Sequence, residues 1–308
     1  MLSRNRVFIL LSLIGATACA DTTEHSPESE AALYQRSYIS EARAEYRMVT
    51  RTTHNGLFQS EETVYIQTLD LPARQAEQLE WLTMVIENAD GDLFRRDARE
   101  DGVPAHVIST ERAGGVTVPA LDHPEWTGAI TDFITFFVPL QSGLGMRELS
   151  EVGDRFNAPE PSIGDWADGT DILFGNDCTQ PTLELTDETE FVFRVRAEFA
   201  APETDCLPFP YEVMRERVDP ETPNNFAQIR HTASGYMVMW GVETFTVNLT
   251  LGRSDSVVGH GELENHLNLI LRGGCDEALE NCQFEAPFTI DRDVTLDRGI
   301  SVSIQQSD

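Results

Sequence analysis

Alternation of apolar and polar residues in the second half of the chain is the feature that most constrains its fold. In the segment 190–199, phenylalanine, valine and alanine occupy one set of alternate positions, and Arg194, Arg196 and Glu198 occupy the other. The segments 245–251 and 262–271 alternate in the same way. Successive side chains of a β-strand point to opposite faces, so each segment is predicted to bury one face and expose the other to water. This pattern is typical of antiparallel sheet.

The first half of the chain is also predicted to be rich in strands. Segments 46–53 and 63–69 are rich in β-branched and aromatic residues, and Asn55-Gly56 between them predicts a turn. The segment 71–82 contains a proline and several helix-forming residues, which favours a short helix.

A second hairpin is predicted at Asp90-Gly91, which lies between two apolar runs. Asn88, Asp90 and Asp92 at alternate positions also admit a calcium-binding loop. An EF-hand loop needs glycine at its sixth position and glutamate at its twelfth, but Leu93 and Arg99 stand there. The hairpin is therefore the preferred interpretation.

The segment 122–138 is the strongest helix prediction. Asp122 and Glu125 have the spacing of a capping box, and Pro139 ends the segment. The apolar side chains recur at helical spacing and form one stripe: Trp126, Ile130, Phe133, Ile134, Phe137 and Val138. We expect this stripe to pack on a sheet, with the wall of a lipid pocket as the alternative.

The predicted fold is therefore mainly β, with the amphipathic helix at about 122–138 packed on antiparallel sheet. A sandwich of two sheets and a half-open barrel both satisfy these patterns. One domain is expected over 33–308. The segment 139–177 is rich in Gly, Pro, Asn and Asp, so a division within 140–177 is the alternative.

The N-terminus predicts export. Arg4 and Arg6 precede a run of twelve mostly apolar residues, 7–18. Because a membrane-spanning helix needs about 20 apolar residues, this run indicates a signal peptide at 1–18. Ala16, Thr17 and Ala18 before Cys19 resemble the lipobox of bacterial lipoproteins, although alanine replaces the usual leucine three residues before the cysteine.

The lipobox resemblance implies cleavage before Cys19 and a lipid on its thiol. It also implies attachment to the cell envelope, and Ala20 after the cysteine points to the outer membrane, on its periplasmic face or at the cell surface. The acidic segment 19–32 would then be a tether. The alternative is an ordinary signal peptide cut after Ala18 or Ala20.

The cysteine count favours lipidation. The chain has five cysteines, and an unpaired thiol is unusual in an exported protein. With Cys19 lipidated, four remain, and we predict disulfides that join Cys178 with Cys206 and Cys275 with Cys282. The spacing does not match that of a zinc site.

The charge of the chain excludes several functions. There are 52 acidic and 22 basic side chains, and every basic one is arginine. Such an acidic surface repels nucleic acid. Without lysine there is no Schiff-base lysine, no pyridoxal phosphate anchor and no P-loop. No Gly-x-Ser-x-Gly or His-Glu-x-x-His motif is present either, so no motif supports an enzyme.

One strand carries the best candidate for metal binding. His260, Glu262, Glu264 and His266 share one face of the predicted strand, so a His-x-Glu pair there has the chemistry to bind Zn²⁺. The two histidines would lie about 20 Å apart, too far for one ion. Asp291, Asp293 and Asp297 form a second acidic group suited to weak Ca²⁺ binding. The preferred interpretation is that both groups of residues form a solvated acidic face that binds no cofactor.

These observations predict a lipid-anchored, non-catalytic binding protein of the cell envelope. A hydrophobic ligand is the sharpest form of this hypothesis, and the membrane is contacted through the N-terminal lipid. The alternatives are a structural or interaction lipoprotein with a filled core, whose partner is an envelope protein, and a metal-dependent hydrolase.

Overall fold

The computed structural model describes residues 43–69, 76–109, 124–137, 149, 151–157, 166–167, 171–174, 182–200, 225–253 and 257–301. The predicted signal peptide and tether, Cys19, Cys178, Cys206 and most of the segment 140–177 lie outside these ranges. The predictions that concern them stay predictions. No helix among the described residues is long and apolar enough to cross a membrane.

Strands dominate the described residues, which also contain the helix α1 (Pro124–Thr135). The strands are β1 (Arg43–His54), β2 (Leu57–Leu69), β3 (Ala76–Asn88), β4 (Leu93–Asp97), β5 (His106–Ser109), β6 (Arg155–Asn157), β7 (Trp166–Ala167), β8 (Asp171–Phe174), β9 (Thr182–Glu188), β10 (Val192–Phe199), β11 (Phe226–Thr232), β12 (Gly235–Gly252), β13 (Val258–Cys275) and β14 (Phe284–Ser301).

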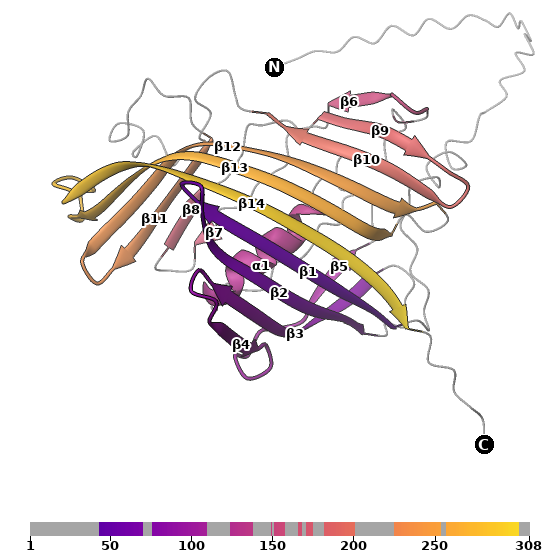
Figure 1. Cartoon of the computed structure of the whole chain (residues 1–308), viewed down its shortest axis with the longest axis horizontal. Helices are drawn as coiled ribbons and strands as arrows, with labels where there is room; N and C mark the ends of the chain where they lie inside the picture. Colours follow the sequence, from indigo (N-terminus) through magenta and orange to yellow (C-terminus); the bar gives the residue numbers. More distant parts are fainter. Residues whose placement is uncertain are drawn as a thin grey trace, which may run out of the picture.

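All the described strands join one antiparallel sheet (Figure 1). Its main path is β4-β3-β2-β1-β14-β13-β12-β10-β9-β6, while β5 pairs with β3, and β11, β8 and β7 continue the sheet beside β12. The prediction of a mainly β fold with antiparallel strands is confirmed. Of the two architectures predicted, the structure is the open one: a single curved sheet, rather than a sandwich of two sheets.

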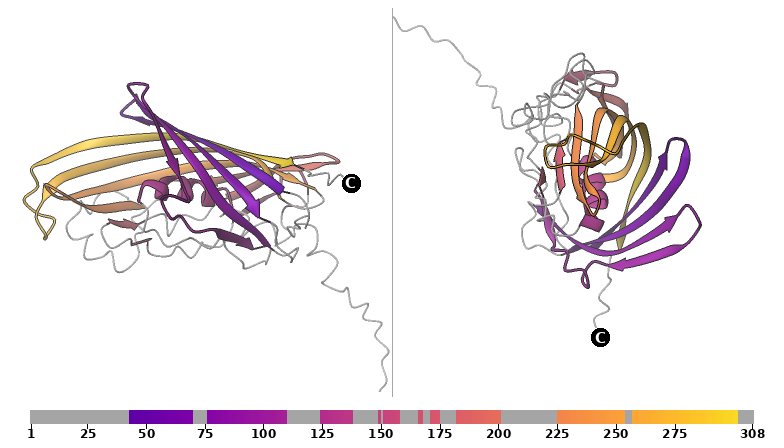
Figure 2. Two further views of the ribbon diagram at one scale, coloured as in Figure 1. Left: turned by 90° about the horizontal axis from the view of Figure 1, so that it is seen from below. Right: turned by 90° about the vertical axis from the view of Figure 1, so that its left-hand side faces the viewer.

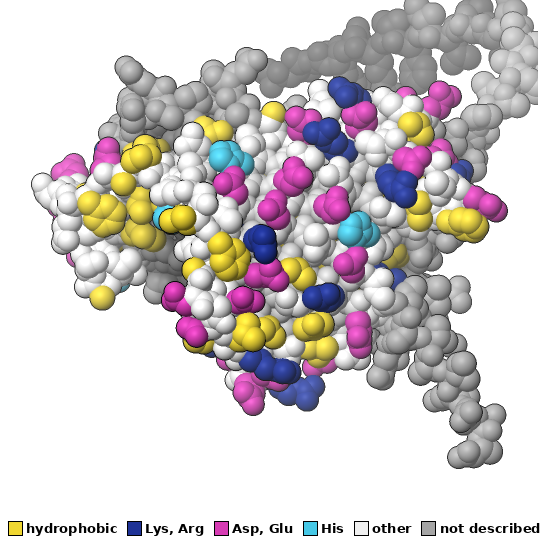
Figure 3. All heavy atoms as spheres, in the orientation of Figure 1, with side chains coloured by type: hydrophobic (Ala, Val, Ile, Leu, Met, Phe, Trp, Pro, Cys, Tyr) yellow, Lys and Arg dark blue, Asp and Glu magenta, His cyan; other side chains and the backbone are white. Residues whose placement is uncertain are grey.

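The sheet curves around α1 and so has a concave and a convex face (Figure 2). Tyr46 and Met48 of β1 lie on the concave face and are fully buried, whereas Arg47 between them points outward. The convex face carries most of the charged side chains that are visible in Figure 3. This division follows from the predicted alternation, because each strand contributes every second residue to the core.

The helix α1 supplies much of the core on the concave face. Phe133 is fully buried, with its ring 5.5 Å from that of Tyr46 and 5.6 Å from that of Trp81. Trp126 is also fully buried and contacts Trp81 edge to face. Gly261 of β13 leaves room for Phe136, just after α1, because a Cβ there would lie 2.5 Å from the ring of Phe136. The helix predicted at 122–138 is thus confirmed as a packed helix over Pro124–Thr135, while the predicted capping residue Asp122 lies outside the described residues.

Both predicted hairpin turns are present. Asn55 and Gly56 have positive φ angles of 47° and 79°, as a two-residue hairpin turn requires. At the second turn, Oδ1 of Asn88 accepts hydrogen bonds from the backbone N–H groups of Asp90 and Asp92 at 3.0 and 2.9 Å. These contacts use the Asn88 side chain to close a tight turn, as the hairpin interpretation predicted.

The helix expected within 71–82 is wrong from residue 76 onward. Residues 76–88 form β3, which pairs with β2 along its length and with β4 or β5 on its other edge. Leu79 and Trp81 occupy alternate positions and are both buried on the concave face. The free energy of burying these two side chains in the sheet outweighs the modest helix propensity of their neighbours.

A disulfide joins Cys275 and Cys282 at the tip of the hairpin between β13 and β14. This is the pairing that the short intervening segment predicts. Leu279 of the closed loop packs beside Trp240 of β12, and Arg272 lies over the same indole ring at 4.8 Å. The disulfide therefore holds an apolar loop residue against the sheet.

Candidate functional site

The four predicted metal-ligand candidates lie together on the convex face of β13. His260, Glu262, Glu264 and His266 are alternate residues of one strand, and their side chains are exposed or partly exposed. Their shared face was predicted correctly from the spacing. The sequence could not reveal what stands opposite them on the next strand.

The register of β13 with β14 joins the two acidic groups that the sequence treats as separate. His260 stands opposite Asp297, Glu264 opposite Asp293, and His266 opposite Asp291. Nδ1 of His260 lies 2.7 Å from Oδ1 of Asp297, and Nδ1 of His266 lies 2.6 Å from Oδ1 of Asp291. Each histidine is therefore held by an aspartate of β14.

These contacts affect the protonation of His260. Partial burial lowers its pKa, but hydrogen bonds with Asp297 and Glu262 outweigh this effect and raise the pKa above the ordinary 6.5. A histidine whose pKa is raised by folding stabilises the fold below its ordinary pKa. That contribution disappears as pH rises through the raised value. Because the side chain is 41% exposed, water screens the effect.

The described residues do not assemble a metal centre on this face. No group of three or more His, Cys, Asp or Glu side chains in the described part of the chain is placed to hold an ion. His260 pairs across the strands with Asp297 and at 3.5 Å with Glu262, while the partner of His266 among the described residues is Asp291. The arrangement is one of separate ion pairs.

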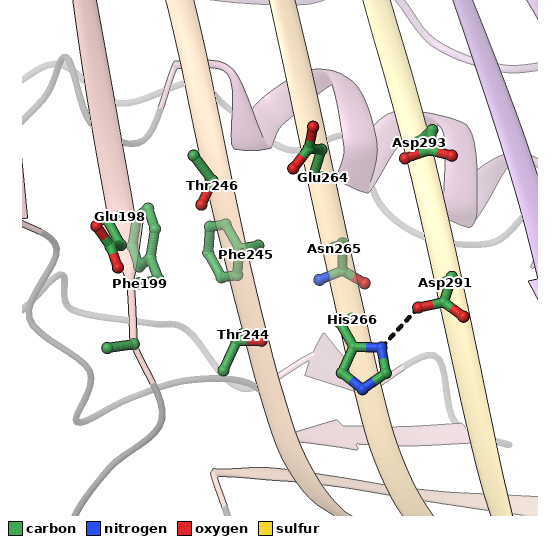
Figure 4. Close-up of a pocket in the computed structure, with 11 residues that line it drawn as sticks. Glu198, Phe199, Thr244, Phe245, Thr246, Glu264, Asn265, His266, Asp291 and Asp293 are labelled. Carbon is green, nitrogen blue, oxygen red and sulfur yellow. Dashed lines mark hydrogen bonds and ion pairs between the residues drawn. The ribbon is translucent and has the colours of Figure 1, made fainter.

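A hollow of about 570 Å³ lies on the sheet over β10, β12, β13 and β14 (Figure 4). Figure 4 shows His266 bonded to Asp291 beside Glu264 and Asp293, which face each other across two strands. Such opposed carboxylates destabilise a strand pair and give the hollow a negative potential. This surface therefore repels anionic ligands.

The concave face holds a different group of polar residues, which we call the concave polar cluster: Thr50, Glu62, Asp132, Glu243, Asn265 and Arg292. Asp132 belongs to α1 and is 3% exposed. Its Oδ2 accepts a hydrogen bond from Oγ1 of Thr50 at 2.8 Å and one from Nη2 of Arg292 at 2.7 Å. Asp132 thus ties the helix to β1 and β14 at once.

Glu62, Glu243 and Asn265 complete this cluster. Glu62 stands opposite Thr50 on β2, and Asn265 stands opposite Arg292 on β13. Nδ2 of Asn265 donates to Oε1 of Glu243 at 2.7 Å. Glu243 lies on β12 where neither β10 nor β11 pairs with it, and the side chain of Asn225 takes their place by bonding its backbone N–H and C=O.

All three acids of the cluster resist ionisation. Loss of water on burial is the largest cause, and it raises the pKa of Glu62, Asp132 and Glu243 above their ordinary values. The negative charge of Asp132 raises the pKa of both glutamates further, whereas Arg292 lowers the pKa of all three. The guanidinium of Arg292 is therefore the cation that three carboxyl groups share. No local sequence pattern predicted that these residues would meet.

An apolar strip continues along the concave face beyond the concave polar cluster. On β13, Leu267, Leu269 and Leu271 follow Asn265 at alternate positions. They pack with residues of β11, β12 and β14 in a group that contains no residue of α1: buried Phe226, Met239, Leu267 and Leu269, and partly buried Met237, Leu271, Phe288 and Ile290. The cluster thus separates the helix-filled core from a second apolar region of the same face.

No protein-family model matches the chain, and no curated protein matches it. Among solved structures, it is similar to one described as "Lipid-protein interactions in lipovitellin", with a TM-score of 0.45 and 11% identity over 87% of this chain. That similarity covers 26% of the lipovitellin chain, so this chain spans about a quarter of it.

A second solved structure is the outer membrane protein opdK from Pseudomonas aeruginosa. The TM-score is 0.20 with 6% identity, over 86% of this chain and 100% of that one. Both TM-scores are below 0.5, so neither similarity assigns a function to this chain.

Proposed function

We propose that the mature chain is a lipid-anchored protein of the bacterial cell envelope that binds an apolar ligand on the concave face of its sheet. The observation that carries the proposal is the apolar strip on β11–β14, which lies beyond the residues that α1 buries. Four of its side chains, Met237, Leu271, Phe288 and Ile290, stay partly exposed. Methionine and aromatic side chains suit an adaptable apolar binding surface.

The opposite face of the sheet at this strip carries polar Asn268 beside a separate apolar group that contains Trp240 and Ile270. Asn268 points to the convex face between Leu267 and Leu269 and is exposed, whereas those two leucines are buried. A ligand with an apolar chain would gain burial against the four partly exposed side chains of the concave strip, at about 25 cal/mol for each Å² removed from water.

Charge substitutions on the two faces test the binding proposal. Leu271→Glu or Phe288→Glu should weaken binding of a dansyl-labelled fatty acid at least about tenfold, because a carboxylate in an apolar site must lose its water. The affinity is measured by fluorescence titration, and the matched control is Asn268→Glu on the convex face of the same strand. Equal affinities for all four proteins, or no binding by the native chain, would contradict the proposal.

The lipid anchor is proposed from the lipobox resemblance and the odd number of cysteines. Cys19→Ser should move the protein from the membrane fraction to the soluble fraction and remove the lipid mass from its N-terminal peptide. Fractionation with mass spectrometry of that peptide measures both effects. A native N-terminus at Asp21, or an unmodified Cys19, would show an ordinary signal peptide instead.

A structural or interaction role is the second candidate, and one observation favours it. The concave face beside β1–β3 is already filled by Trp126 and Phe133 of α1 and by Phe136 and Phe137 just after it, all of them fully buried. If the whole concave face is filled in this way, the dansyl probe should fail to bind the native chain. The same titration therefore separates the two functions.

A further inference from the structure

The charge balance under α1 differs from that of an ordinary helix-to-sheet contact. Asp132 is the only charged side chain of α1 among the described buried residues, and it lies on the sheet rather than in water. Its carboxylate meets Arg292, and Glu62 and Glu243 lie close enough to act on it electrostatically. With all four groups ionised, three negative charges and one positive charge leave an excess of two negative charges.

Other charged groups near α1 do not offset this excess. Asp101 accepts a hydrogen bond from the indole N–H of Trp126 at 2.8 Å and is paired with Arg96 at 3.5 Å. The guanidinium of Arg298 lies over the ring of Tyr46 at 5.7 Å. Neither Asp101 nor Arg298 belongs to the concave polar cluster, so its surplus of carboxylates stays local.

We propose that the concave polar cluster is a proton-controlled latch, which holds α1 on the sheet when it takes up protons and loosens α1 as pH rises. The geometry requires a change in charge at this point, since seating α1 brings Asp132 beside two further carboxyl groups in a site with little water. Release of the helix would return Asp132 to water and remove its negative charge from beside Glu62 and Glu243. The regulatory meaning of the latch rests on the proposed function, because a loosened helix opens more of the apolar concave face.

Linkage gives the sign of the effect. The three carboxyl groups have raised pKa values when α1 is seated, and values near 3.8 for Asp and 4.5 for Glu when they are in water. The seated state therefore binds more protons between these ordinary values and the raised ones. In that window a rise in pH favours release of the helix, and a fall in pH favours the seated state.

Hydrogen exchange on the ligand-free chain from Ala20 onward tests the latch. After correction for the intrinsic exchange rate, the opening constant of α1 amides should rise from pH 5 to pH 8. The rise can reach about tenfold per pH unit for each linked proton. Amides of the central strand β14 should show a weaker dependence.

Isosteric neutral variants assign the effect to the cluster. Glu62→Gln and Glu243→Gln should each flatten the pH dependence of α1 opening by removing a titrating group. Glu61→Gln and Glu264→Gln, which point to the convex face on the same or a neighbouring strand, should leave it unchanged. The latch is refuted if α1 and β14 share one pH profile, or if neither cluster variant changes the profile of α1.

The outcome of this experiment is independent of the ligand. If the cluster variants flatten the pH dependence of α1 opening but the dansyl probe does not bind the native chain, the latch stands and the proposed ligand is wrong. If the probe binds the native chain while α1 opening ignores pH, the proposed function stands and the latch is wrong.

Discussion

Replacing Phe133 with alanine should lower the free energy of unfolding by about 3–5 kcal/mol. Phe133 is fully buried, and its ring packs against Tyr46 of β1, Trp81 of β3 and Phe137 just beyond α1 at centroid distances of 5.5, 5.6 and 5.0 Å. Truncation leaves a cavity where the helix meets two strands, and surrounding rings are too rigid to fill it. Urea denaturation followed by circular dichroism measures the loss.

Leu57→Ala is the matched control for this large-to-small change. Leu57 is the first residue of β2, next to the turn, and is 75% exposed, so its truncation should change the stability by less than about 0.5 kcal/mol. A loss at Phe133 as small as that at Leu57 would mean that α1 is not part of the cooperative core. The structure would then be wrong about what fills the concave face.

Local patterns were enough to predict most of the sheet. The alternation in β10, β12 and β13 predicted correctly which residues face the core, because a strand's two faces are set by residue parity. The prediction was wrong at Phe191, which precedes β10 and is 75% exposed. The two hairpin turns were also predicted correctly, because Asn-Gly or Asp-Gly between two apolar runs is typical of a hairpin turn. Strand β3 was not, because its burial depends on pairing with β2, to which no local pattern points.

The convex face shows that the pattern of a single strand does not predict which residues pair across strands. The spacing of His260 and His266 placed them on a common face, but their partners Asp297 and Asp291 lie 37 and 25 residues away. Which aspartate meets which histidine depends on the register of β13 with β14. Prediction from single strands therefore gave two separate acidic groups, where the fold has one face on which two His–Asp pairs flank the opposed carboxylates of Glu264 and Asp293.

The concave polar cluster was beyond sequence analysis for a similar reason. Asp132 lies at the edge of the apolar stripe of α1, and the residues one turn away, Gly128 and Phe136, offer it no cation. A carboxylate on the apolar side of a helix, with no cation one turn away, indicates that its polar partners lie elsewhere in the chain. Its partners Thr50 and Arg292 are 82 and 160 residues distant, and only the curvature of the sheet brings them under the helix.

Arg292→Met should lower the free energy of unfolding by about 3 kcal/mol at pH 8. Breaking a buried ion pair costs about 3–5 kcal/mol, and the lower end applies because the Arg292 side chain is 27% exposed. The substitution leaves Asp132 buried without its cation, next to Glu62 and Glu243. Denaturation at pH 8 and at pH 5 should show a smaller loss at pH 5, because protonated carboxyl groups no longer need the guanidinium.

The double variant Asp132→Leu with Arg292→Met separates charge from packing. Replacing a buried ion pair by apolar side chains is often neutral or stabilising, so the second substitution should recover most of the loss at pH 8. It should also reduce the difference between pH 5 and pH 8, since Asp132 no longer takes up a proton. A double variant that is as unstable as Arg292→Met, with the same pH dependence, would locate the effect in the aliphatic stem of Arg292 rather than in the ion pair.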